Sequence, residues 1–343
     1  MGTTTQHFSS TTGTPVPETM RAIVQERYGD ADRLRLADIP TPGAGEGEVL
    51  VRVHAAGLDR GTWHLMTGKP YAMRLALGFR GPKNPVPGLD LAGTVVAVGG
   101  STPGFSVGDE VFGIGKGSFA EYAVARVDKL VRKPARLTFE QAAVVPVSAM
   151  TAHRAVVDVG RVESGQRVLV IGASGGVGSY AVQIAKALGA EVTGVSSTAK
   201  LDLVRTLGAD HVLDYTRDDF ADGTQRYDLI IDIAGNPCLR RLRRALTPGG
   251  TAVLTGGEDG GPLTGGLDRQ VRAMVLSRFV GQRLTGFVPR ERASDLELVA
   301  DLIAGGGVSP SIDRTYSLAD VPEAMRRLEA GEVRGKIAIA VTS

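Results

Sequence analysis

In the second half of the chain, short apolar runs alternate regularly with amphipathic stretches. The apolar runs are rich in Val, Ile and Leu, which is typical of strands buried on both faces. They are "RVLVIG" at 167–172, "EVTGVS" at 191–196, "HVLDY" at 211–215, "YDLIIDIAG" at 227–235 and "TAVLTGG" at 251–257. Residues with helical spacing separate most of them, as in "SYAVQIAKALGA" at 179–190. Strands and helices alternating at this spacing predict an α/β domain with a parallel, doubly wound sheet of the Rossmann type.

The first part of the chain has a different pattern, of short apolar or alternating runs divided by clusters of Gly and Pro. The runs are "RAIVQERYG", "EVLVRVHAAGL", "LAGTVVAVG" and "EYAVARVDKLVRK". This pattern predicts a small barrel-like β domain. Helical patterning is expected to begin near Thr138, which can cap a helix through residue 158, with Gln141 in the capping-box position.

Composition narrows the classes of function. A length of 343 residues predicts two domains, and a net charge of +2 gives no general attraction to nucleic acid or to a membrane surface. No apolar run reaches membrane-spanning length. The single cysteine, Cys238, excludes an intrachain disulfide and favours a reducing, cytoplasmic location. Residues 1–18 are rich in Ser and Thr and are expected to form a disordered tail.

The strongest motif is the Gly-rich turn in "VLVIGASGGVGSYAV", between a predicted strand and a predicted helix. Ala173, Gly175 and Gly178 occupy the three positions of a dinucleotide-binding fingerprint. A small residue permits the tight turn, the second position lets the backbone approach a pyrophosphate, and the third lets the helix pack against the strand. The residues predicted to bind the cofactor here are Ala173, Ser174, Gly175, Gly176, Val177 and Gly178.

The next strand predicts which dinucleotide is bound. An acid about 20 residues after the turn would bind the ribose hydroxyls of NAD and repel a 2′-phosphate. Here the strand ends in Ser196 and Ser197, and Lys200 follows with a positive charge. Hydroxyl groups and an ammonium favour a phosphate, so NADPH is the predicted cofactor. A second Gly-rich stretch, 255–266, follows a strand's carboxyl end, and its Gly256 is predicted to lie at the nicotinamide.

Several further pieces resemble the medium-chain dehydrogenase/reductase superfamily. They are "AAGLDRGTWHLMTG", "VPGLDLAGTVVAVG", "VGDEVFG", "GSFAEYA", "ASGGVG" and "RGKIAI", in that superfamily's order. The resemblance implies a GroES-like substrate domain formed by residues 19–146 and 313–343. It also implies an inserted Rossmann domain at 147–312 and a homodimer.

The resemblance also predicts that the protein does not use zinc. The zinc alcohol dehydrogenases of the superfamily have metal ligands where this chain has Asp59, Leu89-Asp90 and Pro146, and leucine and proline cannot ligate. The chain is therefore similar to the zinc-independent quinone oxidoreductase branch, close to its reticulon-4-interacting-protein-like members. In that branch the residues matching Ser196, Lys200 and Tyr215 hold the 2′-phosphate.

Such a protein is expected to transfer hydride from NADPH to a quinone or to an activated C=C or C=O bond. A proton must also arrive, and Tyr71 and Asp59 are the candidate catalytic residues, ahead of His64. Each of them can instead be structural: a buried turn Asp, a surface His or a packing Tyr. Trp63 can wall the substrate pocket or equally belong to the core. Two alternatives stay open: an enoyl-thioester or enone reductase with a long acyl groove, and an NADPH-binding protein without turnover.

Overall fold

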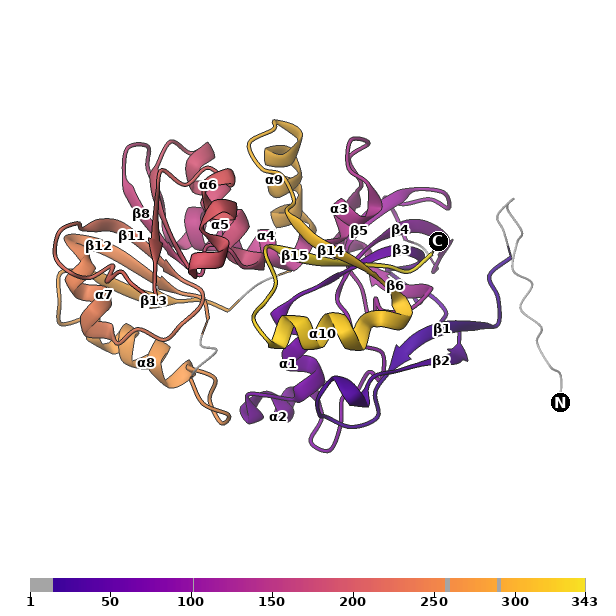
Figure 1. Cartoon of the computed structure of the whole chain (residues 1–343). Helices are drawn as coiled ribbons and strands as arrows, with labels where there is room; N and C mark the ends of the chain where they lie inside the picture. The colour runs from indigo at the N-terminus through magenta and orange to yellow at the C-terminus, as the bar shows by residue number, and fades with distance from the viewer. Residues whose placement is uncertain (1–14, 101, 257–259, 289–290, 343) are drawn as a thin grey trace, which may run out of the picture.

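Strands from the first half of the chain and from residues 312–340 form one β domain (Figure 1). The computed structural model describes residues 15–100, 102–256, 260–288 and 291–342. Within these residues a seven-stranded sheet has the order β14-β15-β3-β4-β5-β7, with β6 paired to β3. Its strands are β3 (Glu48–Leu58), β4 (Asp90–Val98), β5 (Glu110–Ile114), β6 (Tyr122–Arg126), β7 (Leu130–Arg132), β14 (Ile312–Ser317) and β15 (Lys336–Ala340). Strand β15 lies antiparallel to β3, so the C-terminal segment completes a sheet that begins about 280 residues earlier.

The middle of the chain forms the predicted parallel sheet. The described residues contain six parallel strands in the order β10-β9-β8-β11-β12-β13. They are β8 (Arg167–Ile171), β9 (Glu191–Ser196), β10 (His211–Asp214), β11 (Tyr227–Asp232), β12 (Leu246–Leu254) and β13 (Arg283–Gly286). The order reverses between β8 and β11, which is the point where open parallel sheets bind ligands.

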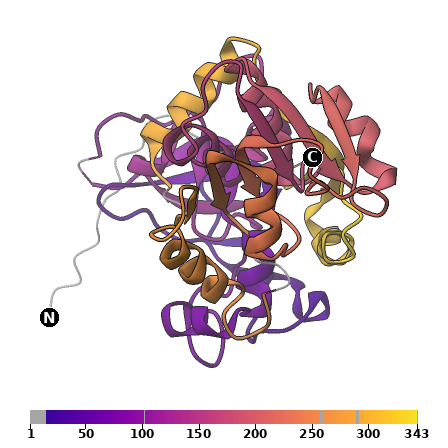
Figure 2. The same cartoon turned by 90° about the vertical axis from the view of Figure 1, so that its left-hand side faces the viewer.

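Helices cover both faces of this sheet, which explains its continuous apolar runs. One face packs against α4 (Pro146–His153), α5 (Gly176–Ala187), α6 (Leu201–Thr206) and α9 (Ala293–Ala304). The other face packs against α7 (Leu239–Ala245) and α8 (Leu267–Leu276). In Figure 1, α4 and α9 lie between the parallel sheet and the β domain. Figure 2 views the molecule from the side of the parallel sheet, with the orange segments toward the viewer.

The predicted helical segment from Thr138 is present and is divided into several pieces. Thr138 caps α3 (Phe139–Ala143), and the capping box with Gln141 is confirmed. The helical segment is divided, because α3 ends before Val144, which leaves helical geometry, and the chain continues as α4 from Pro146. Proline has no N–H to donate, which suits it to the first turn of a helix. Beyond α4 the helix widens into a π-helix, η4 (Arg154–Val159).

Helical structure also begins earlier in the chain than Thr138, which corrects the expectation that it begins there. Helix α1 (Arg60–Thr67) follows β3 directly, and the Asp59 carboxylate accepts a hydrogen bond from the Thr62 N–H at its start. Gly68 ends α1 in the left-handed conformation, with φ 60°. The sequence pattern did not predict α1, because its eight residues lie next to short apolar runs that are typical of strands. The 3-10 helix η2 (Tyr71–Met73) and α2 (Arg74–Leu77) follow.

The remaining elements support the β domain. Strands β1 (Thr19–Val24) and β2 (Arg35–Pro40) form an antiparallel pair, and α10 (Val321–Glu329) precedes β15. The domain boundaries at 146/147 and 312/313 stay a prediction. The predicted tail, 1–18, lies mostly outside the described residues. Among the helices that the structure describes, none is both long and apolar enough to cross a membrane.

Candidate cofactor and active site

The Gly-rich turn connects β8 to α5 at the point where the strand order reverses. A Cβ on Gly178 would lie 2.0 Å from the carbonyl oxygen of Gly172, so only glycine fits there. A Cβ on Gly175 would meet only that same oxygen, at 3.5 Å, which leaves the helix start open. Gly172 itself has φ 88°, a requirement of the turn that the fingerprint did not reveal. Backbone N–H groups at an open helix start can bind a pyrophosphate.

The turn residues lie against the end of the neighbouring strand. The Ala173 N–H donates to the carbonyl of Val195, at 3.0 Å, and the Ser174 carbonyl accepts from the Gly335 N–H, at 2.8 Å. The predicted cofactor residues at 173–178 therefore lie between the end of β9 and the loop before β15.

The predicted adenosine residues meet at the carboxyl ends of β9 and β10. Ser196 is the last residue of β9 and is 3% exposed. Its carbonyl accepts a hydrogen bond from the N–H of Tyr215, which follows β10 and is 65% exposed. Ser197 is half-buried beside them. Hydroxyl groups from two strands thus lie at one edge, where the ribose of a dinucleotide is expected.

Lys200 is held more firmly than the sequence suggested. Its ammonium donates to the carbonyl oxygens of Gly331 and Val333, at 2.6 and 2.8 Å. Burial lowers the pKa of this ammonium below its ordinary value. An ammonium has three N–H donors, so one remains for a phosphate oxygen. The two carbonyls fix the position of the Lys200 charge. They belong to a segment about 130 residues further along the chain.

Two charged groups at the adenosine end were missed by the sequence analysis. Arg334 donates to the carbonyl of Ala199, at 3.2 Å, and forms an ion pair with Asp202, at 2.6 Å. It comes from the loop before β15, within the motif "RGKIAI", so only the fold brings it to this site. It adds a second cation to the one that Lys200 supplies.

The second missed group is Asp214, the register partner of Ser196 on β10. Its buried carboxylate corrects the picture of an adenosine end without any nearby acid. The carboxylate accepts from the N–H and hydroxyl of Thr216, at 3.0 and 2.7 Å, and from the Thr198 hydroxyl. These donors occupy both carboxylate oxygens of Asp214. The oxygens are therefore directed into the protein rather than toward a ribose.

The expected nicotinamide end is held by a buried ion pair. A Cβ on Gly256 would lie 1.8 Å from the carbonyl oxygen of Ile233, so β11 and the Gly-rich stretch approach closely. Beneath them, Arg269 of α8 contacts the Asp232 carboxylate at 2.5 Å, and both side chains are almost fully buried. Burial raises the pKa of Asp232 to about 6, although the charge of Arg269 opposes the shift. The pair fixes α8 under the ends of the strands.

Asp59 uses one carboxylate oxygen to cap α1, and its other carboxylate oxygen makes no hydrogen bond to the described residues. One carboxylate oxygen accepts from the N–H and hydroxyl of Thr62, at 2.8 and 3.2 Å, and this cap explains its burial. The other oxygen, Oδ2, is buried and has no hydrogen-bond partner among the described residues. The structural interpretation of Asp59 is therefore supported by its contacts, while its second oxygen is available for chemistry.

A second buried acid, Asp90, was missed as part of the site. Its carboxylate accepts from the Val147 N–H, at 3.0 Å, and lies 3.6 Å from the Lys336 ammonium. Lys336 also donates to the Ser148 hydroxyl, at 2.9 Å. Burial raises the pKa of Asp90 well above its ordinary value, while Lys336 opposes the shift and Asp59 adds to it.

This cluster touches the cofactor turn. A Cβ on Gly176 would lie 3.0 Å from the Lys336 side chain and 3.2 Å from the Ser148 hydroxyl. Asp90 and Lys336 belong to "VPGLDLAG" and "RGKIAI", which the sequence analysis used only to infer the fold. The buried pair thus joins the β domain to the first residue of α5.

Tyr71 lies in direct contact with the Gly-rich stretch 255–266. Its N–H donates to the Pro262 carbonyl, at 2.8 Å, so η2 contacts the connection between β12 and α8. The Tyr71 ring is 41% exposed and stacks on the Arg74 guanidinium, at 4.6 Å. Trp63 packs partly against the core of the β domain and does not line the main cavity described next.

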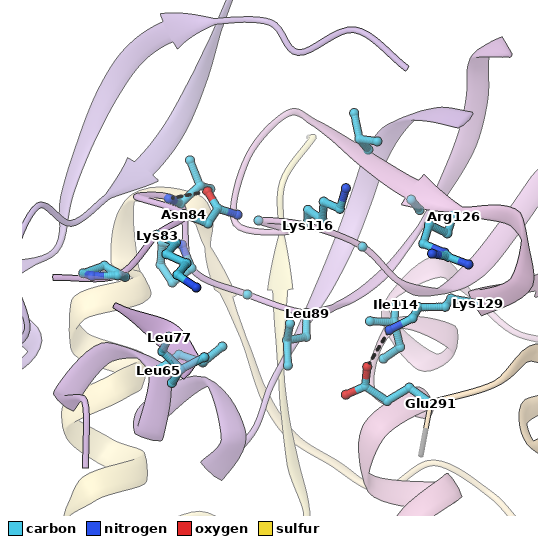
Figure 3. A pocket seen from close by; sticks show the side chains of 18 of the residues that line it. Leu65, Leu77, Lys83, Asn84, Leu89, Ile114, Lys116, Arg126, Lys129 and Glu291 are labelled. Atoms are coloured by element: carbon cyan, nitrogen blue, oxygen red, sulfur yellow. Dashed lines mark hydrogen bonds and ion pairs between the residues drawn. The ribbon is translucent and has the colours of Figure 1, made fainter. Parts of the chain in front are cut away.

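A cavity of about 310 Å³ opens in the β domain (Figure 3). Leu65, Leu77, Leu89 and Ile114 give it an apolar lining. Glu291, from the connection between β13 and α9, closes one side through an ion pair with Lys129 at 3.0 Å. The volume is at the lower end of the range for small-molecule sites.

No three His, Cys, Asp or Glu side chains within the described ranges lie close enough to hold a metal ion. Of the positions that match the zinc ligands of alcohol dehydrogenases, Asp59 caps α1, Leu89 lines the cavity and Pro146 begins α4. Whether the protein works without zinc stays a prediction.

Comparison with known proteins gives concordant results. Residues 45–135 match the alcohol dehydrogenase GroES-like domain, and residues 207–339 match a family described as zinc-binding dehydrogenase. The 2-methylene-furan-3-one reductase of Solanum lycopersicum is 31% identical over 96% of this chain and 81% of its own length. The segment that matches the zinc-binding dehydrogenase family includes none of residues 59, 89 and 146.

Solved structures agree over the same length. The quinone oxidoreductase from Coxiella burnetii has a TM-score of 0.83 and 27% identity, over 94% of this chain and all of its own. A mycobacterial protein complexed with NADPH has a TM-score of 0.80 and 29% identity, again over 94% and 100%.

A GroES-like β domain joined to a doubly wound sheet with a Gly-rich turn at its switch point defines a nicotinamide-dependent oxidoreductase. The extent and level of sequence identity identify the family more narrowly. The chain belongs to the medium-chain dehydrogenase/reductase superfamily, in its quinone-oxidoreductase-like branch, and the predicted fold class is confirmed.

Proposed function

We propose that this protein is an NADPH-dependent, zinc-independent reductase of quinones or of C=C and C=O bonds conjugated to an electron-withdrawing group. One observation carries the proposal: the Gly-rich turn leads to a proposed adenosine end that is lined by hydroxyls and cations, and the carboxylate nearby, that of Asp214, is hydrogen-bonded within the protein. Ser196, Ser197 and Tyr215 supply the hydroxyls, and Lys200 with Arg334 the charge. The mycobacterial relative complexed with NADPH supports the same cofactor.

When bound, NADPH supplies a hydride. The chain's own residues bind the cofactor, orient its nicotinamide and deliver a proton to the substrate. The turn at 173–178 holds the pyrophosphate through backbone N–H groups. Asp232 and Arg269 keep the Gly-rich stretch and Gly256 beside the nicotinamide. The apolar cavity around Leu89 excludes water from the acceptor, which favours transfer to carbon over side reactions.

Two groups are proposed to deliver the proton. The unpartnered Asp59 Oδ2 is buried, whereas the Tyr71 hydroxyl belongs to an exposed ring. Asp59→Asn and Tyr71→Phe separate the two: loss of the donor lowers kcat and changes its pH profile, while a structural role changes mainly stability. Solvent is the donor if neither variant alters the pH profile of kcat.

The substrate class rests on the names of relatives and on the cavity. One relative is a reductase of a 2-methylene-furan-3-one, and another is a quinone oxidoreductase. A cavity of about 310 Å³ suits a small conjugated acceptor and gives no support for the long acyl groove of an enoyl-thioester reductase. A panel of quinones, short enones and long-chain enoyl thioesters, followed by the absorbance of NADPH, tests this ranking. Tight NADPH binding with no turnover across the panel would establish the alternative of a binding protein.

The cofactor assignment has its own experiment. Ser196→Asp and Ser197→Asp place an acid at the adenosine edge and are expected to weaken NADPH binding relative to NADH. Titration of both dinucleotides by protein fluorescence gives the ratio of dissociation constants. Lys186→Gln is the matched control, because Lys186 pairs with Asp210 at the far end of β9. An unchanged ratio in both acidic variants would show that the 2′-phosphate binds elsewhere.

The zinc-independence of the reaction is tested directly. Metal analysis of active protein, together with activity after dialysis against a chelator, is expected to show no stoichiometric zinc and no loss of rate. Leu89 and Pro146 carry this expectation, because neither can act as a ligand.

Homodimer formation is proposed from the surface of α8. Its outer face exposes Leu267, Val271, Met274 and Val275, each about half exposed, beside the sheet-edge strand β13. Light scattering is expected to give a dimer, and Val271→Glu to give a monomer. Leu298→Glu on α9 is the control, since Leu298 is equally exposed outside this face. A cytoplasmic location is proposed from the single cysteine, and fluorescence microscopy of a tagged chain tests it.

A further inference from the structure

The charged residues that line the cavity are strongly unbalanced. Glu291 is the one acid among its lining residues, within the described part of the chain. The cations of the lining are Lys83, Lys116, Arg126 and Lys129. A purely neutral acceptor would not require this excess of positive charge.

Three of the four cations have acidic partners nearby. Lys129 pairs with Glu291 at 3.0 Å, and Lys116 with Glu48 at 2.7 Å. Arg126 makes a two-point contact with Asp128, at 2.7 and 2.9 Å. These pairs neutralise most of the excess at the far side of the cavity.

Lys83 is the exception. No ion pair or hydrogen bond joins its ammonium to any other residue that the structure describes. Its neighbour Asn84 uses its side-chain oxygen to accept from the Val86 N–H, at 3.1 Å, which leaves the amide N–H₂ as a donor. Figure 3 shows Lys83 and Asn84 at one end of the cavity and Lys129 with Glu291 at the other. This end of the cavity therefore offers an unneutralised cation and an amide donor side by side.

The rest of the lining is apolar, so the occupant needs two parts. Leu65, Leu77 and Leu89 form a surface for a flat hydrocarbon head. The end of the cavity that Glu291 closes lies just beyond β13. This is the carboxyl edge of the parallel sheet, where the nicotinamide is expected. A head against the leucines can thus face the cofactor while a charged tail reaches Lys83.

We propose that the preferred acceptor is a small conjugated carbonyl compound or quinone that carries a carboxylate, which Lys83 and Asn84 bind. The inference rests on the proposed function for the identity of the reaction. Lys83 and Asn84 are exposed, so their charge-assisted contact is expected to change affinity by only roughly 3- to 10-fold.

The test uses two ligands of nearly equal size, trans-3-benzoylacrylate and its methyl ester. Calorimetric titration into the protein saturated with NADP⁺ measures binding without turnover. The acid is expected to bind roughly 3- to 10-fold more tightly than the ester, and Lys83→Gln to remove that difference. Arg52→Gln, which deletes an exposed cation of β3 outside the cavity, is expected to keep it.

Equal affinity of acid and ester in the unmodified protein would overturn the proposal, as would a preference that survives in Lys83→Gln. Turnover of the ester with NADPH is scored separately, so failure of the reductase assignment is distinguishable from failure of the carboxylate site. Crotonyl-coenzyme A and the N-acetylcysteamine thioester form a second pair with the same head. The coenzyme A thioester could bind more tightly than its partner in a way that depends on Lys83, while benzoylacrylate and its ester bind equally. That result would mean that Lys83 binds a phosphate, and it would overturn the proposal of a carboxylate site.

Discussion

The two ends of the proposed cofactor site use charge in opposite ways. At the proposed adenosine end, Lys200, Arg334 and the Tyr215 hydroxyl are partly exposed, and water screens each of them. At the proposed reaction end, Asp90, Lys336 and the Asp232–Arg269 pair are almost fully buried. Exposed groups can tune affinity in small, separable steps. Buried charges are strongly coupled, so changing one affects the fold as well as the chemistry.

The largest effect should come from breaking the buried pair. Lys336→Met leaves Asp90 without its countercharge in a site that water does not reach. We expect the free energy of unfolding to fall by about 3–5 kcal/mol. Urea denaturation measures it, and the double variant Asp90→Asn/Lys336→Met is expected to recover most of the loss. If the single variant is as stable as the parent, the reaction end is not held together by this pair.

The second effect concerns Asp232 and pH. Because its pKa in the folded protein is about 6, above the ordinary value of 3.8, the folded state keeps a proton that the unfolded state has lost. Stability from this group is therefore complete below pH 4 and declines by about 3 kcal/mol as the pH rises past 6. Asp232→Asn should be less stable overall but should lack this decline. Identical slopes between pH 4 and 7 would contradict the raised pKa.

A smaller effect is expected from Arg334 at the exposed end. Arg334→Gln removes a cation that is already paired with Asp202, so NADPH affinity should fall by roughly 3- to 10-fold. NADH affinity should hardly change, because NADH lacks the 2′-phosphate. Titrations at low and high salt should show the difference shrinking as salt screens the charge. Equal losses for both dinucleotides would mean that Arg334 only supports the loop.

The smallest effect should come from Tyr215→Phe. The hydroxyl of an exposed tyrosine contributes one hydrogen bond in competition with water, so NADPH affinity should fall by only about 2- to 5-fold. A loss of NADPH affinity well above the 3- to 10-fold expected for Arg334→Gln would show that exposed groups at this end do not act in small steps.

Local sequence patterns were sufficient for the features that depend on near neighbours in the chain. The alternation of strands and helices from Arg167 predicted the parallel sheet, and the spacing of Ala173, Gly175 and Gly178 predicted the tight turn between β8 and α5. The capping box at Thr138 was equally readable. Helix α1 was not, because its eight residues are too few to show a period, and its start depends on the Asp59 cap.

The sequence by itself determined the fold class and the turn, since backbone geometry and strand burial are encoded within a few residues. The tertiary structure alone decided which charges meet. Arg334 lies beside Asp202, Lys336 beside Asp90, and Asp214 beside Ser196, although 18 or more positions separate each pair in the chain. Electrostatic energy depends on distance and burial in space, and neither quantity can be read from the order of residues.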